Sequence, residues 1–91
     1  MTLTQAQIDQ ALATLPGWQC DSDTLTRAYV FDSFAQAIAF MVRVGFEAQA
    51  LNHHPMLCNV YNRVTVTLCT HDAGDKITDR DLALAQAIQT I

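Results

Sequence analysis

The sequence predicts an α+β fold with the element order helix, strand, strand, helix, strand, strand, helix. Three segments carry apolar residues at helical spacing behind a capping pattern, and two intervening segments have the alternation and turn residues of strand pairs. The connections are too short for long crossovers, so we expect a four-stranded, mostly antiparallel sheet with the helices packed on one face. We expect residues 1–91 to form a single domain.

The first helix is predicted by Thr4-Gln5-Ala6-Gln7, a capping-box pattern in which Gln7 reaches back to the backbone of Thr4. Pro16-Gly17 ends this helix, and a short strand begins at Trp18. After a turn at residues 21–23, a second strand covers residues 25–31. The apolar positions of the helix are Ile8, Ala11, Leu12 and Leu15, and those on one face of the second strand are Leu25, Tyr29 and Phe31.

The second helix is the longest and most apolar element, at about 18 residues, and opens with a capping box formed by Ser33 and Gln36. Its apolar residues cover so much of the circumference that it needs covering on two sides, one by the sheet and the other by a subunit contact. Pro55 disfavours the α conformation at His54, so this helix should end near His53.

Residues 57–69 are rich in β-branched side chains and predict a hairpin with a turn at Asn62-Arg63. This register, which a four-residue loop over residues 61–64 shares, pairs His54 directly with His71 across the strands, on one face. The pairing depends on the turn, because a slip of one residue would place the two rings on opposite faces. Beyond a loop at residues 72–76, Thr78 and Asp81 cap the third helix.

Composition narrows the classes of function. Hydrophobic residues make up 51% of the chain and charged residues 15%, so a partner or a second copy should cover some apolar surface. The net charge of −4 argues against binding to nucleic acid or to an anionic membrane. The sequence shows neither a membrane span nor a signal region, and Cys20, Cys58 and Cys69 lack metal-ligand spacing. We therefore expect a cytoplasmic protein with reduced thiols.

All three histidines, His53, His54 and His71, fall in the two segments that this hairpin would bring together. Imidazole titrates near neutrality, so the cluster could serve general acid–base catalysis. Three histidines would also suffice as metal ligands, but adjacent His53 and His54 project differently and the spacing is poor for a metal. The third interpretation is a helix stop with surface imidazoles of no chemical role.

Other candidates have structural alternatives. Asp81 is first of all a helix cap, although a capping carboxylate can also face a pocket. Trp18 fits the core or an interface as well as stacking on a ligand. Gln49 and Asn52 lie close to the histidine pair, but polar residues at a helix end usually meet only water.

The ordered motifs of this chain resemble the pterin-4a-carbinolamine dehydratases, and the similarity runs from about Leu3 to the C-terminus. Upstream, the likeness lies in residues 15–18, residues 31–34 and the long Ala-rich helix. The motifs that carry the resemblance are His53-His54-Pro55, Asn59-Val60-Tyr61-Asn62 with Val64, Thr67-Leu68, Thr70-His71-Asp72-Ala73-Gly74, and Thr78 with Asp81.

The resemblance implies a hydro-lyase that dehydrates 4a-hydroxytetrahydropterin to quinonoid dihydropterin, which recycles the cofactor of aromatic amino-acid hydroxylases. It implies catalysis by His53, His54 and His71 without a metal or redox cofactor, and a link to such a hydroxylase. We expect His54 and His71 to act as the acid–base pair, with His53 orienting the ring. It also implies homodimers joined through the sheet edge and homotetramers joined through the long helix. The residues expected to hold the pterin are Asn52, His53, His54, Thr70, His71, Asp72, Gln49, Asp81 and Trp18.

The chain departs from the family at several positions. Gln49 and Asn52 stand where many members have acidic residues that could raise the pKa of an imidazole. Met56 and Leu57 replace acidic and aromatic residues that often follow the proline. The loop from His71 to Asp81 is one residue longer than in the animal enzymes, a length found in bacterial members.

Two other functions stay open. Some animal members also bind a transcription factor through the helical surface, and dehydratase-like assembly chaperones lack the histidines. A non-catalytic binding protein is therefore the alternative from a different class, and retention of all three histidines favours the enzyme. An enzyme acting on another pterin, such as one of molybdopterin metabolism, is the second alternative.

Overall fold

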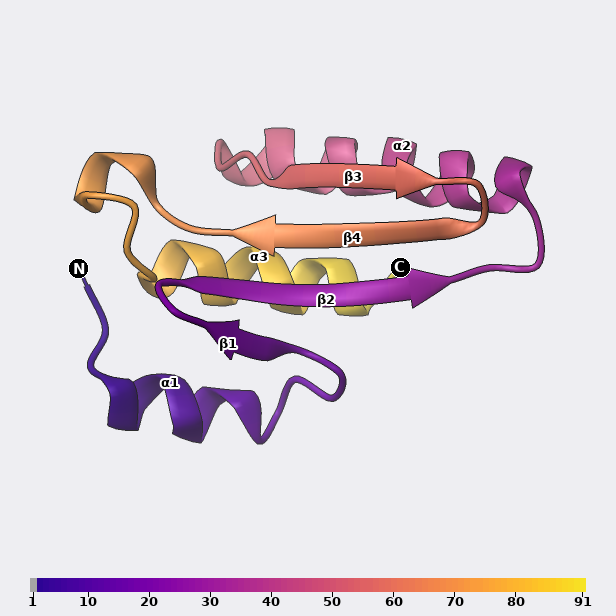
Figure 1. The fold of residues 1–91 in the computed structure, drawn as a ribbon. Helices are drawn as coiled ribbons and strands as arrows, with labels where there is room; N and C mark the ends of the chain where they lie inside the picture. Colours follow the sequence, from indigo (N-terminus) through magenta and orange to yellow (C-terminus); the bar gives the residue numbers. More distant parts are fainter. Residues whose placement is uncertain (1) are drawn as a thin grey trace.

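The computed structural model of the chain describes residues 2–91 and shows the predicted order of helices and strands (Figure 1). The sheet order is β1-β2-β4-β3, and all three neighbouring pairs are antiparallel. The predicted α+β class is therefore confirmed. The elements are α1 (Gln5–Leu12), β1 (Gln19–Asp21), β2 (Thr24–Val30), α2 (Phe34–Leu51), β3 (Met56–Val60), β4 (Arg63–Leu68), the short 3-10 helix η1 (His71–Ala73) and α3 (Asp79–Gln89).

The helices α2 and α3 lie behind the sheet in Figure 1, and α1 lies beside the edge strand β1. In the central strand β4 the buried side chains alternate along the chain with more exposed ones, as a sheet covered on one face requires. Full burial of a Val or Leu side chain stabilises the fold by about 1.5–3 kcal/mol. The largest fully buried apolar side chains from these strands and helices are Leu25, Val64, Val66, Leu68, Val44, Leu84 and Ile88.

Side-chain caps fix where the helices begin. The capping box predicted at α1 is present, with Thr4 Oγ1 accepting from the Gln7 amide and Gln7 Oε1 accepting from the Thr4 amide. At α2 only half of the predicted box forms. Ser33 Oγ accepts from the Gln36 amide, but the Gln36 side chain accepts from the amide of Asp32 instead of that of Ser33. The Gln36 side chain therefore binds the backbone one residue before the cap, at Asp32.

The hairpin turn differs from the prediction. Val60 pairs with Arg63, so the turn residues are Tyr61 and Asn62 rather than Asn62 and Arg63. Tyr61 takes a left-handed conformation with φ of 52°, and the Asn59 side chain donates to the carbonyl of Tyr61 within the turn and to that of Arg63 directly after it. These two side-chain bonds favour the observed turn.

The corrected turn shifts the strand pairing by two residues. The observed register, continued past the strand ends, would place His54 opposite Cys69 and not opposite His71. In addition, β3 begins at Met56 and β4 ends at Leu68, so both histidines lie outside the ladder. The predicted cross-strand pair of His54 and His71 is therefore wrong, although an even shift leaves the face of each strand residue unchanged.

No helix within residues 2–91 has the length and apolar character needed to cross a membrane. Cys20, Cys58 and Cys69 are all free thiols.

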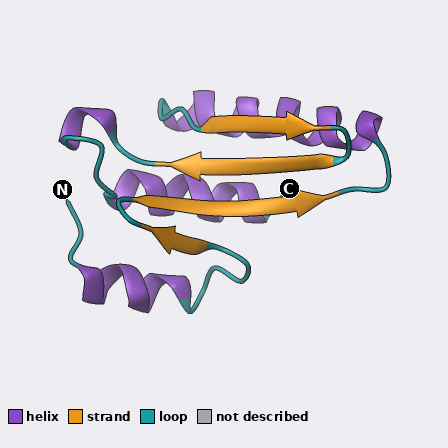
Figure 2. Ribbon diagram, in the orientation of Figure 1, coloured by secondary structure: helices purple, strands orange, loops and turns teal. Residues whose placement is uncertain are grey.

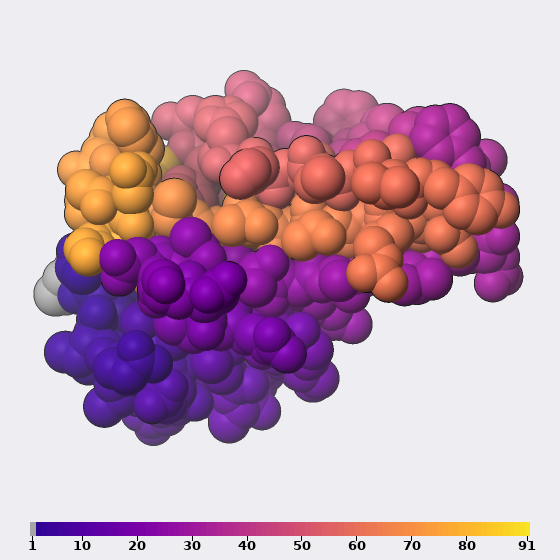
Figure 3. Space-filling model, in the orientation of Figure 1, coloured from indigo at the N-terminus to yellow at the C-terminus, as the bar shows by residue number. Residues whose placement is uncertain are grey.

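In Figure 3 the segment that follows β4, in orange, stands out at one end of the molecule, well above α1 in indigo. That end of the sheet carries the histidines.

Candidate functional site

One pocket of about 200 Å³ brings all three histidines together at the end of the sheet. It lies where the corner from α2 to β3 and the segment from β4 to α3 reach the same end of the strands (Figure 2). The volume is below the roughly 300–1,000 Å³ of typical sites for drug-sized ligands, so it suits a compact molecule. The lining residues are Asn52, His53, His54, Cys69, Thr70, His71, Asp72 and Arg80.

The corner before β3 is built by a helix end that stops abruptly. Asn52 caps α2 in the left-handed conformation, with φ of 49°, and asparagine tolerates that conformation better than most residues. The amide of His53 then donates to the carbonyl of Ala48 at 3.0 Å, which satisfies one carbonyl of the last helical turn. Pro55 keeps the chain extended after this point. The predicted end of the helix is thus confirmed to within two residues.

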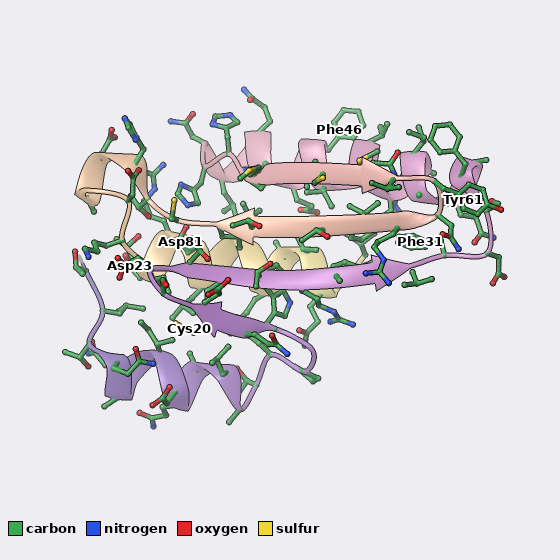
Figure 4. All side chains as sticks on the ribbon, in the orientation of Figure 1. Cys20, Asp23, Phe31, Phe46, Tyr61 and Asp81 are labelled. Atoms are coloured by element: carbon green, nitrogen blue, oxygen red, sulfur yellow. The ribbon has the colours of Figure 1, made fainter. Side chains whose placement is uncertain are left out.

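His53 is the buried member of the cluster, with 6% of its surface exposed. Its Nε2 lies 2.5 Å from Oδ1 of Asp81, a carboxylate that is completely buried at the start of α3 (Figure 4). The other oxygen of Asp81 accepts from Thr70 Oγ1 and from the amide of Thr78, both at 2.8 Å. Asp81 therefore forms the predicted capping box and holds His53 through the same carboxylate.

This arrangement fixes the tautomer of His53. A carboxylate only accepts hydrogen bonds, so Nε2 of His53 carries the proton and donates it to Asp81. The lone pair of the neutral ring is then on Nδ1. An imidazole held by a buried carboxylate in one tautomer is the arrangement by which proteins orient a general base.

His54 has a different environment, since it is exposed and its Nε2 lies 3.3 Å from the side-chain oxygen of Gln49. Gln49 does not line the pocket itself, but it contacts His54, which does. The amide brings no charge to the ring.

His71 lies on the opposite wall, in η1, and is also exposed. Its Nδ1 lies 2.9 Å from Oδ1 of Asp75. The hydrogen bond from this ring to Asp75, and the negative charges of Asp75 and Asp72, raise the pKa of His71 above its ordinary value of 6.5. The pocket thus has an imidazole that favours its protonated form on one wall and one held by a buried carboxylate on the other.

Two lining residues were missed by the sequence analysis, Cys69 and Arg80. Arg80 donates from Nη2 to the carbonyl of Asn52, so it ties the first turn of α3 to the end of α2. Burial, followed by the charges of Asp75 and Asp81, raises the pKa of the Cys69 thiol, so this cysteine stays protonated. No local sequence pattern connects Arg80 to a carbonyl 28 residues away, so nothing in the sequence signalled this contact.

Most of the other predicted residues meet at this pocket. Asn52, Thr70 and Asp72 line it, and Asp81 supports it from behind. Trp18 is the residue that the structure does not bring there, because its side chain is 5% exposed and belongs to the hydrophobic core. Within residues 2–91, no three His, Cys, Asp or Glu side chains are arranged so as to hold a metal ion.

The whole chain, residues 1–91, matches the family model described as pterin 4 alpha carbinolamine dehydratase. The chain belongs to this family. Family membership confirms the predicted family and, with it, the predicted class of enzyme, a pterin dehydratase of the hydro-lyase type.

Named members of the pterin dehydratase family are similar over almost their full length. A pterin-4-alpha-carbinolamine dehydratase of Opitutus terrae is 55% identical over 89 residues, which are 98% of this chain and 92% of the relative. One of Rhodospirillum rubrum is 46% identical and is covered over 94% of its length.

Solved structures agree with the fold of the family. The structure titled transcriptional coactivator/pterin dehydratase from Brucella melitensis has a TM-score of 0.92 and 36% identity, with 99% of this chain and 97% of that chain covered. A pterin dehydratase-like protein, described as a RuBisCO assembly factor in the alpha-carboxysome, has a TM-score of 0.64 and 20% identity, with 80% of this chain covered. The second likeness shows the fold alone.

Proposed function

We propose that this pocket dehydrates a 4a-hydroxytetrahydropterin to the quinonoid dihydropterin and water, and so returns the pterin to an aromatic amino-acid hydroxylase in the cytoplasm. The observation that carries the proposal is the convergence of His53, His54 and His71 on one pocket in a chain of the pterin dehydratase family. The three free thiols are in keeping with a reducing compartment.

The reaction needs one acid and one base. The bond from C4a to the hydroxyl breaks, and the hydroxyl takes a proton from an imidazolium and leaves as water. A neutral imidazole takes the proton on N5, and the electrons of that N–H bond form the double bond between N5 and C4a. Each proton transfer by a positioned side chain contributes roughly 10²–10⁴-fold to the rate. The two imidazoles then exchange protons with solvent.

We assign these roles from the environments of the rings. His71 serves as the acid, because Asp75 and Asp72 favour its protonated form. His53 serves as the base, because Asp81 holds its Nε2–H and leaves a lone pair on Nδ1. His54 was expected to form the acid–base pair with His71, but the observed register does not pair the two residues across the strands. We therefore assign His54 to binding the pterin ring. Asn52, Thr70 and Asp72 line the same pocket, so we assign them to binding as well.

The test is the dehydration rate of freshly generated 4a-hydroxytetrahydropterin, followed by ultraviolet absorbance above the spontaneous background. The protein would be compared with the double variant His53→Ala/His71→Ala, and with Gln10→Ala on the exposed surface of α1 as a matched control. We expect acceleration by the unaltered protein and by the control, and none by the double variant. A folded protein that gives no acceleration would refute the dehydratase proposal. Substrates with different C6 side chains would reveal a preference for another pterin.

We also propose that the chain forms homodimers and homotetramers. Four side chains spaced by four residues project from one side of α2 into solvent, and their exposed fractions run from 37% to 73%. Figure 4 shows Phe46 of this row directed away from the sheet. The edge strand β3 has a free side in the sheet and exposes Met56 and Val60. The row on α2 consists of Phe34, Ile38, Val42 and Phe46.

Sedimentation would test the assembly. A charge in the middle of the row, Val42→Glu, should remove the contact through α2 and lower the mass of the assembly. The same substitution at Ala39, which is exposed on α2 outside the row, is the matched control and should leave the mass unchanged. An unaltered protein that sediments as a monomer would contradict the proposal.

A further inference from the structure

The loop from His71 to Lys76 contains a carboxylate, that of Asp75, to which the proposed reaction assigned no role beyond its charge. We infer that Asp75 is a positioning residue: it holds the Nδ1–H tautomer of His71, so that Nε2 is the nitrogen that exchanges a proton with the ligand. The inference rests on the proposed function for the identity of the ligand, but the tautomer itself is a property of the protein alone.

The geometry of the loop sets this contact. Nδ1 of His71 lies 2.9 Å from Oδ1 of Asp75, and since the carboxylate can only accept, the proton of this bond belongs to Nδ1. Asp75 is four residues from His71, and the chain between them is a 3-10 turn that ends at Gly74 in the left-handed conformation. The pair is therefore a local contact that forms once this turn has formed.

Backbone bonds hold the turn closed from both sides. The amide of Asp75 donates to the carbonyl of Thr70 at 3.1 Å, and the amide of Thr70 donates to the carbonyl of Lys76 at 2.8 Å. Outside the loop, Lys76 Nζ lies 2.8 Å from Oδ2 of Asp23, which fastens the loop to the turn between β1 and β2. Asp75 is thus placed by the backbone, and Lys76, which would compete for its carboxylate, is directed elsewhere.

The conformation of Asp75 itself gives a second observation. Its φ is 60°, in the left-handed region that costs most residues energy, whereas aspartate and asparagine tolerate it through local hydrogen bonds. At this φ the carboxylate meets the ring of His71. The left-handed backbone at Asp75 therefore accompanies the contact between this side chain and His71.

The other charged or titratable groups near His71 differ from Asp75. Asp72 adds negative charge beside the ring and lines the pocket, whereas Asp75 makes the hydrogen bond to the ring. On the facing elements, Asp81 is engaged by His53, Thr70 and Thr78, and the Arg80 guanidinium donates to the carbonyl of Asn52. The groups around His71 are Asp72, Asp75 and Lys76 on its own loop, Cys69 after β4, His53 and His54 on the corner, and Arg80 and Asp81 on α3.

The test is long-range proton–nitrogen NMR of the histidine rings, which reports the tautomer and the pKa of His71 in one titration. Two variants separate charge from hydrogen bonding. Asp75→Asn removes the charge and keeps an acceptor, and Asp75→Gly removes both while allowing the left-handed backbone. Asp72→Asn removes an equal charge from the same loop without removing the bond, so it is the matched control.

We expect the neutral ring of His71 to be protonated at Nδ1 in the unaltered protein and in Asp72→Asn, and at Nε2 in Asp75→Gly. The pKa of His71 should fall in all three variants, and most in Asp75→Gly. In the dehydration assay, kcat of Asp75→Gly should decline at a lower pH on the alkaline side, with KM little changed.

An Nε2–H ring in the unaltered protein would overturn the inference, as would a pKa in Asp75→Gly no lower than in Asp72→Asn. If the unaltered protein shows the Nδ1–H tautomer but does not accelerate dehydration, the proposed function fails and the role of Asp75 in holding the ring stands. The two failures are therefore distinguishable.

Discussion

His53 and His71 line the same pocket but are held in opposite ways. His53 is buried, and its partner Asp81 is completely buried and engaged by two further donors. His71 is exposed, and its partner Asp75 lies on a surface loop. The buried pair costs desolvation and is stabilised by a network, whereas the exposed pair is screened by solvent and contributes little to stability. We therefore expect substitutions in the buried pair of His53 and Asp81 to destabilise the fold. Substitutions in the exposed pair of His71 and Asp75 should leave the stability almost unchanged.

The largest effect on stability should come from Asp81→Ala. The substitution leaves His53, the hydroxyl of Thr70 and the amide of Thr78 without their acceptor, and each buried group left unsatisfied costs about 1–3 kcal/mol. We expect the free energy of unfolding to fall by about 2–5 kcal/mol in urea denaturation. The exposed counterpart, Asp75→Gly, should change it far less, and equal losses would remove the distinction between the two walls.

A smaller loss is expected from Thr70→Val, which keeps the shape of the side chain and removes its hydroxyl. Thr70 Oγ1 donates to Asp81 and lies 2.6 Å from the hydroxyl of Thr78, so the variant breaks two contacts of the network while the bond from His53 to Asp81 stays. We expect a loss of about 1–2 kcal/mol in the same measurement. A neutral result would show that this hydroxyl is dispensable to the network.

On the exposed side, Nε2 of His54 lies 3.3 Å from the amide oxygen of Gln49. The substitution Gln49→Glu would place a carboxylate there. An opposite charge at this distance favours the protonated ring, so the pKa of His54 should rise, with the stability almost unchanged. NMR titration of His54 checks the direction. Gln5→Glu on α1 is the control for net charge, and an unmoved pKa of His54 would mean that the two side chains do not meet in solution.

The smallest effect concerns the dependence of stability on pH. The pKa of His71 is raised in the folded chain. The stabilising contribution of its ion pair with Asp75 is therefore fully present at a pH below the unfolded pKa, near 6.5. That contribution is lost as the pH rises through the higher folded pKa. The stability difference between the unaltered protein and His71→Ala should therefore shrink as the pH rises through that range. A difference that grows with pH would contradict the sign of the shift.

The sequence predicted the fold because its local patterns agree with one another. The capping boxes at Thr4 and Thr78, the helix stop before Pro55 and the alternation in the strands are all short-range features, and each reappears in the structure. Asp81 was recognised as a cap by the same means. Its second contact, with His53, joins residues 28 apart and was not visible in any local pattern.

The errors have physical causes of the same kind. The turn at Tyr61 is stabilised by the side chain of Asn59 and requires a positive φ at a tyrosine, which turn preferences do not predict. The wrong turn produced the wrong register, and with it the pairing of His54 and His71. The histidines still meet because both segments leave the same end of the sheet, a consequence of topology that survives a shift in register.

The assignment of the base is best tested by kcat for dehydration in His53→Ala compared with His54→Ala, each confirmed as folded by circular dichroism. We assign proton transfer to the ring that Asp81 holds and ligand binding to the exposed ring beside it. We therefore expect His53→Ala to lower kcat by roughly 10²–10⁴-fold, whereas His54→Ala should mainly raise KM. A loss of kcat in His54→Ala as large as that in His53→Ala, or larger, would contradict this assignment and return the base to the exposed histidine.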